Sequence, residues 1–173
     1  WSTETAGAGW VTTAGNNGSE FSAYHNDDTG PQDDWLISPE LDLSATSEVM
    51  FRYFEMVGWA FAATEHNVLL SIDGGANWSV VLNNAIDQSG GWVQHTIDLS
   101  SVAGGEPSVK IAFQYVGDYS AEWSIDDVRI EPIPDFVLTH YNVYRDGASA
   151  GQTTDLSFYE VIVTEGTYNY TVT

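Results

Sequence analysis

The residues of this chain best suited to chemistry are two pairs of adjacent aspartates, Asp33-Asp34 and Asp126-Asp127. Each pair lies in an apolar, strand-like run, before residues 35–37 and within residues 123–130. A carboxylate buried in a strand costs free energy unless a partner neutralises it. Two such pairs, far apart in the sequence, therefore suggest one shared cation, and oxygen-only ligands favour calcium. Two other interpretations stay open, namely solvated acids at strand ends and a catalytic pair of carboxylates.

The second pair interrupts the alternation of its own strand. Trp123 and Ile125 share one parity, whereas Val128 and Ile130 share the other. One extra residue at Asp126-Asp127 restores the register, which predicts a β-bulge. Because a bulge re-aims side chains, we expect at least one of these aspartates to turn toward a ligand.

Three aromatic residues are candidates for ligand binding. Trp59 and Phe61 lie in residues 57–63, which read as a loop between strands, and Tyr119 follows Gly117-Asp118. Exposed aromatic rings stack on sugars or anchor protein interfaces. The alternative is a place in the core, where most tryptophans of a sandwich lie.

Other catalytic and metal-binding patterns are absent from the sequence. The four histidines, His25, His66, His95 and His140, are scattered and form no zinc-type spacing. There is no cysteine, nucleophile elbow, phosphate-binding loop or dinucleotide fingerprint. The sequence therefore predicts a protein that is not an enzyme.

The net charge of the chain limits which classes of molecule can be its partners. The sequence has 25 acidic residues and only four basic ones, which gives a formal net charge of −21. Such a field repels phosphate backbones and anionic membrane surfaces, so nucleic acid is excluded as a partner. It suits divalent cations, a salty habitat, or both. No apolar run is long enough to span a membrane, so no membrane insertion is expected.

The elements that must position these residues are predicted to be strands. Period-two alternation recurs throughout, and no segment sustains helical spacing over a dozen residues. Eight or nine short strands separated by Gly, Asn, Asp and Ser turns predict an all-β, two-sheet sandwich. The expected strands lie near residues 21–25, 35–38, 48–56, 68–72, 78–82, 92–99, 109–115 and 122–131.

One hairpin has a recognisable spacing. Residues 71–78 read Ser-x-Asp-x-Gly-x-x-Trp, which resembles the Asp-box hairpin of sialidases and other β-proteins. Asp73 and Gly75 supply the turn, and Trp78 packs back onto the strand. A single copy indicates a structural hairpin rather than a catalytic mark.

A linker and a second, smaller module follow. Two prolines in three residues predict a linker at 132–137, because proline cannot join a central strand. Residues 138–173 contain about three strand-like runs, too few for an independent sandwich. The chain begins at Trp1 and stops within a strand-like run, so we expect it to be a piece of a longer protein.

Four segments of the first part of the chain match a known pattern in order and spacing, namely residues 33–39, 91–92 with 97–100, 109–113 and 125–128. Through them, residues 1–131 resemble the cleaved-adhesin or choice-of-anchor J family of bacterial surface domains, relatives of MAM-type jelly rolls. Members of this family usually begin with a strand ahead of a Gly-Trp that corresponds to Trp1, and that strand is absent here. Through residues 141–147 and 166–173, residues 138–173 resemble the middle and end of a fibronectin-III-like module.

The resemblance implies a fold and a role. The fold is all-β, a jelly-roll β-sandwich followed by a partial fibronectin-III-like β module. Structural calcium is implied, with Asp34 and one or both of Asp126 and Asp127 at the family's acidic positions, and Glu20 as a looser match. The role is a secreted or cell-surface adhesion domain that binds a glycan or an extracellular protein.

Two alternatives for the function stay open. The chain could be a structural subunit of a surface assembly, with self-association through strands shared between copies. It could also be the accessory binding domain of a secreted hydrolase whose catalytic part lies outside this segment.

Overall fold

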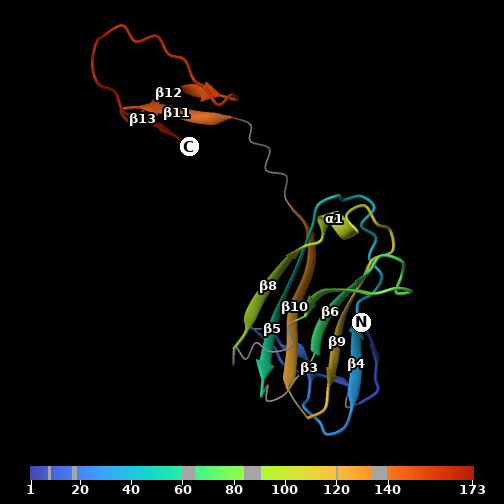
Figure 1. The fold of residues 1–173 in the computed structure, drawn as a ribbon. Helices are drawn as coiled ribbons and strands as arrows, with labels where there is room; N and C mark the ends of the chain where they lie inside the picture. The colour runs from blue at the N-terminus through green and yellow to red at the C-terminus, as the bar shows by residue number, and fades with distance from the viewer. Residues whose placement is uncertain (8, 17–18, 60–64, 84–90, 120, 134–139) are drawn as a thin grey trace. The chain divides into compact units, whose positions relative to one another are not determined.

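The structure is a computed structural model that describes residues 1–7, 9–16, 19–59, 65–83, 91–119, 121–133 and 140–173. It divides into two compact units, Trp1–Ile133 and Pro134–Thr173. Figure 1 shows both as ribbons, and each is described by itself.

The first unit is a sandwich of two antiparallel five-stranded sheets, as the sequence predicts. The first sheet has the order β1 (Ser2–Glu4), β4 (Gln32–Ile37), β9 (Lys110–Gly117), β6 (Glu65–Ser71) and β7 (Ser79–Asn83). The second has the order β2 (Trp10–Ala14), β3 (Phe21–His25), β10 (Glu122–Pro132), β5 (Val49–Gly58) and β8 (Val93–Asp98). A single helical turn, α1 (Ser100–Ala103), joins β8 to β9.

The core lies between the two sheets and follows the period-two pattern. Along β5 every second residue is buried, beginning with Val49 and Phe51. Facing side chains of β9, Ile111 and Phe113, are at most 1% exposed. Trp123 of β10 is fully buried between them and packs edge-on against Phe113. Side chains from both inner faces therefore form one continuous core.

The predicted β-bulge in β10 is confirmed. The pairing of β10 with β5 shifts register between Asp126 and Arg129. Asp127 adopts a left-handed backbone with φ 49°. On either side of the shift the apolar residues reach the same core, Ile125 before it and Val128 after it.

The boundary of the first unit differs from the predicted linker. β10 continues to Pro132, which pairs with Val49, and the N–H of Ile133 donates to the carbonyl of Glu48. The strand β3 pairs with β10 only opposite residues 123–125, so Pro132 has a neighbouring strand on one side alone. Its missing N–H therefore costs no ladder hydrogen bond. Residues 134–139 lie outside the described residues.

Two strands were missed by the sequence analysis, and both lie at sheet edges. β1 is exposed throughout and pairs with β4, so it supplies the first edge of its sheet. β2 is exposed at every position except Trp10, which is half-buried. Without buried residues neither strand carries an apolar alternation to detect.

The second unit is a three-stranded antiparallel sheet in the order β12 (Ala148–Thr153), β11 (Tyr141–Arg145) and β13 (Tyr170–Val172). The expected number of strands is found. Val143 is its buried apolar residue, whereas Leu156 and Val163 are more than 90% exposed. Its likeness to fibronectin type III stays a prediction.

Candidate functional site

The structure places the two aspartate pairs on different sheets. Asp34 lies in β4 and shares the inward parity of Leu36, so its fully buried side chain lies between the sheets. Asp126 lies in β10 on the opposite parity from Ile125, on the outer face of the second sheet, and is 8% exposed. The structure does not bring the two pairs together.

Asp34 is neutralised by hydrogen bonds from one loop and one histidine. Its Oδ1 accepts the backbone N–H groups of Ala6 and Gly7 at 2.5 and 2.9 Å. Its Oδ2 accepts the N–H of Gly9 at 3.0 Å and His25 Nε2 at 2.7 Å. Burial would raise the pKa of Asp34, but these hydrogen bonds outweigh it and hold the pKa below its usual value. Each oxygen accepts two hydrogen bonds, so this carboxylate has no lone pair left for a cation.

Asp126 ties an early loop to the last strand of the sandwich. Its Oδ2 accepts the N–H of Asn16 at 2.6 Å, and its Oδ1 accepts the N–H of Asp127 at 2.7 Å. The hydroxyl of Ser19 adds a longer contact of 3.4 Å. The loop approaches closely because residue 15 is glycine: a Cβ there would lie 2.9 Å from Asp126 Oδ2.

The other two residues predicted as metal ligands lie on the surface. Asp33 Oδ1 accepts Trp35 Nε1 and Gln114 Nε2 on the outer face of the first sheet, and Glu20 is exposed before β3. Across the described residues, no group of three or more His, Asp or Glu side chains could hold a metal ion. Structural calcium stays a prediction, and Asp126-Asp127 is where carboxylate oxygens remain for it.

Sequence reasoning missed a buried polar cluster between the sheets. Glu55, 2% exposed, accepts His95 Nε2 at 2.8 Å and Trp123 Nε1 at 3.0 Å. His25 and His66 are fully buried. The period-two pattern could have revealed these residues. Glu55 has the same inward parity as the core residues of β5, and His66 has the same inward parity as those of β6.

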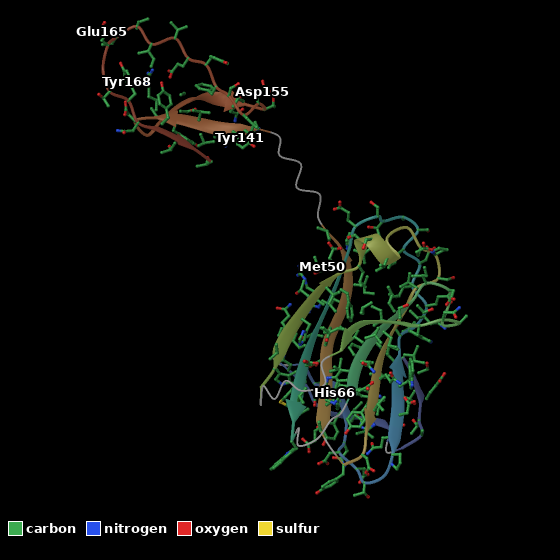
Figure 2. All side chains as sticks on the ribbon, in the orientation of Figure 1. Met50, His66, Tyr141, Asp155, Glu165 and Tyr168 are labelled. Carbon is green, nitrogen blue, oxygen red and sulfur yellow. The ribbon has the colours of Figure 1, made fainter. Side chains whose placement is uncertain are left out.

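His66 is the least satisfied member of this cluster. Neither ring nitrogen has a hydrogen-bond partner within the described part of the chain, and the ring stacks on Trp123 at 4.4 Å with 2° between the planes. Burial, with a smaller contribution from His25, lowers the pKa of His66 to about 3. Figure 2 labels His66 in the interior of the first unit, toward the end opposite Met50.

The candidate ligand-binding aromatics gather at that same end of the sandwich. Gly58 pairs with Glu122, so β5 ends where β10 begins, and we call this the loop end. Trp59 is 61% exposed and Tyr119 is 64% exposed. Both adopt left-handed backbone, with φ of 54° and 49°. Phe61, the third predicted residue, lies outside the described residues.

The Asp-box spacing forms the predicted hairpin between β6 and β7. Asp73 Oδ1 accepts the N–H of Asn77 at 2.9 Å, and Ser71 Oγ accepts the N–H of Gly75 at 2.8 Å. Hydrogen bonds from Asn77 and Ser71 lower the pKa of Asp73 to about 2. Trp78 packs against Trp35 with ring centroids 5.7 Å apart, so the motif acts as a structural hairpin.

The described residues form no helix of the length and apolarity that a membrane crossing requires. No family model matches the chain, and no curated protein sequence matches it significantly.

Solved structures match the chain in fold. The K1 cleaved adhesin domain of Lys-gingipain from Porphyromonas gingivalis W83 is 22% identical, with a TM-score of 0.62 over 78% of this chain and 91% of that chain. The K3 cleaved adhesin domain of Lys-gingipain is 21% identical, with a TM-score of 0.57 over 76% and 90%. TmCBM61, solved in complex with beta-1,4-galactotriose, is 14% identical, with a TM-score of 0.56 over 77% and 88%. At these identities the likeness concerns the arrangement of the strands, and this chain has a cleaved-adhesin-like jelly-roll fold.

Proposed function

We propose that the first unit is an extracellular adhesion domain that binds a glycan, through Trp59 and Tyr119 at the loop end. The fold supports a binding role, because the similar structures include adhesin domains and a carbohydrate-binding module solved with a galactotriose. Secretion or display at the cell surface is part of the same proposal.

The backbone of the two aromatic residues carries the proposal. A left-handed conformation costs a residue with a Cβ about 1–2 kcal/mol. Trp59 and Tyr119 both adopt it, and both present large, mostly exposed rings at the same end of the sandwich. Strained backbone of this kind clusters at active sites and ligand-binding sites. Rings held in this way offer flat apolar faces on which sugar rings can stack.

The neighbouring loop braces the position of Tyr119. The backbone N–H of Tyr119 donates to the carbonyl of Asp28 at 3.1 Å, and the carboxylate of Asp118 accepts the N–H of Gly30 at 3.0 Å. Two hydrogen bonds therefore fix the turn that presents this ring. A preformed turn lowers the entropy lost on binding.

A glycan array followed by calorimetry tests the proposal. Trp59→Ala and Tyr119→Ala are each expected to weaken binding of an array hit by about threefold to tenfold, the effect of losing one stacked ring. Phe21→Ala is the matched control, because Phe21 is 58% exposed on β3, away from the loop end. An array without hits, or equal affinities for all four proteins, contradicts the proposal.

A second candidate function, self-association, rests on the second unit. Its exposed apolar side chains include Tyr159, Val161 and Val163, each more than 85% exposed. Exposed apolar surface of this kind favours contacts between copies. Mass measurement over a concentration series tests it, and a strict monomer at high concentration argues against assembly.

A further inference from the structure

Half of the basic residues of this chain face each other across two neighbouring strands. Arg52 of β5 and Arg129 of β10 are direct cross-strand partners. The whole chain has only four bases against 25 acids. Like charges directly opposite each other destabilise a sheet unless acids nearby offset the repulsion.

The two arginines line a cavity of about 500 Å³ on the outer face of the second sheet, where β5 and β10 run side by side. Phe54 and Gln94 also line it, together with Asp127 at the bulge. The bulge places Asp127 at this hollow in the surface, and its predicted turn toward a ligand stays a prediction.

The charges within the cavity cancel. Arg52 Nη1 lies 2.9 Å from Glu131 Oε1, and Arg129 Nη2 lies 3.8 Å from Asp127 Oδ1. A carboxylate that enters meets two guanidinium groups and two acids, rather than the strongly negative field of the chain as a whole. Arg129 is the more available of the two bases, because its side chain is 67% exposed.

Two donors of residues that line this cavity have no partner among the residues that the structure describes. Arg52 Nε and Asn16 Nδ2 are each shielded from solvent and form no hydrogen bond there. Asn16 is 6% exposed and also lines the cavity. A buried donor without an acceptor is costly, and a rotation of either side chain toward the cavity would let an oxygen atom of a ligand satisfy it.

We propose that this cavity binds an acidic sugar unit, one that carries a ring carboxylate beside free hydroxyl groups. Guanidinium groups bind a carboxylate through paired, charge-assisted hydrogen bonds, which Arg52 and Arg129 supply. Asp127 and Glu131 accept hydrogen bonds from the hydroxyl groups, and Phe54 offers an apolar face to the ring. A densely sulfated or phosphorylated polymer fits less well, because it lacks the hydroxyl donors and the net charge of −21 repels it.

The inference rests on the proposed function in that the ligand is a glycan, but it uses a different surface. Arg52 lies in β5, and Trp59 follows seven residues later, just beyond the end of that strand. At a rise of about 3.3 Å per residue the two positions lie roughly 20 Å apart. Substitutions at one surface therefore leave the other intact.

Calorimetry with trigalacturonic acid, its methyl ester and a sulfated disaccharide tests the proposal. The acid is expected to bind, and the ester at least about tenfold more weakly, because it keeps the hydroxyl groups and loses the charge. Arg129→Gln should lower affinity for the acid at least about tenfold. Lys110→Gln makes the same change of charge on the other sheet and should leave affinity within about twofold.

Each other outcome counts against the proposal. Equal binding of acid and ester, equal affinities of the Arg129 and Lys110 variants, or preference for the sulfated sugar overturns it. Absence of acidic-sugar binding, with Trp59-dependent binding of an array hit intact, refutes this inference and leaves the proposed function standing. Binding that depends on Arg129 but not on Trp59 or Tyr119 refutes the loop-end site instead.

Discussion

His25 Nε2 lies 2.7 Å from Asp34 Oδ2, and neither side chain is exposed to solvent. The other ring nitrogen, Nδ1, lies 2.8 Å from the carbonyl oxygen of Asn26. Nε2 donates to Asp34, because that carboxylate also accepts three backbone N–H groups. Asp34 is therefore the shared acceptor in four buried or half-buried hydrogen bonds.

Asp34→Asn is therefore expected to destabilise the first unit strongly. The amide group of asparagine would present a donor to N–H groups that now share a carboxylate, and each buried donor left unpaired costs about 1–3 kcal/mol. All seven tryptophans lie in the first unit, so denaturant unfolding followed by tryptophan fluorescence reports on that unit alone.

Asp33→Asn is the matched control, since it makes the same change at the exposed neighbour. Its free energy of unfolding should stay within about 0.5 kcal/mol of the parent value, as for most surface substitutions. Similar losses for both variants would show that the buried pair contributes nothing specific.

His66→Phe is expected to stabilise the first unit at pH 7. Phenylalanine keeps the stacking on Trp123 and removes two buried nitrogens that have no partner. Losing such unpaired groups should raise the free energy of unfolding by about 1–2 kcal/mol. His140→Phe, in the second unit, is the control and should leave the tryptophan-detected transition unchanged. A marked loss of stability in the His66 variant would indicate that the larger ring overpacks the core instead.

The same histidine predicts how stability depends on pH. The pKa of His66 is about 3 in the folded protein, below the ordinary value of 6.5. The unfolded chain therefore binds a proton that the folded chain excludes between these values, and stability falls as pH drops from 6.5 toward 3. Asp34, whose pKa is also lowered, adds a loss of stability below its ordinary value of 3.8. Unfolding measured from pH 7 to pH 4 should show a shallower slope in His66→Phe, and an unchanged slope would contradict this assignment.

Calcium removal tests the metal prediction directly. If carboxylate oxygens at Asp126-Asp127 hold structural calcium, EGTA should lower Tm by about 5 °C or more relative to saturating calcium. Asp127→Asn should remove this difference, whereas Asp33→Asn should keep it. Equal Tm values in calcium and EGTA would show that calcium does not stabilise this fold.

Gly15→Ala tests the loop that is tied to Asp126. A Cβ at this position would lie 2.5 Å from Ser19 Oγ and 2.8 Å from the Ser19 carbonyl oxygen. The backbone must move to admit it, so we expect a loss of about 1–3 kcal/mol in the free energy of unfolding. Gly166→Ala is the control, because its Cβ would meet Tyr168 at an ordinary 3.5 Å. Equal stability of the two variants would show that the loop adapts freely.

The sequence predicted those parts of the fold that depend on side chains. The strands with buried alternate residues and the bulge in β10 were found because apolar residues mark them. The partners of the aspartates were not found, since Ala6, Gly9 and Asn16 bind through backbone N–H groups that nearly every residue type has. The cross-strand pairing of Arg52 and Arg129 was also missed, because it depends on the register of strands about seventy residues apart.

The bulge in β10 also takes up one residue for which the ladder with β5 has no place. If Asp127 instead took a regular place in that ladder, the segment that follows would turn over and exchange its two faces. Val128 and Ile130 would move into solvent, while Arg129 and Glu131 would enter the core. Deletion of Asp127 would straighten the strand and keep Val128 and Ile130 in the core, so what the extra residue supplies is the left-handed backbone and the carboxylate at the cavity.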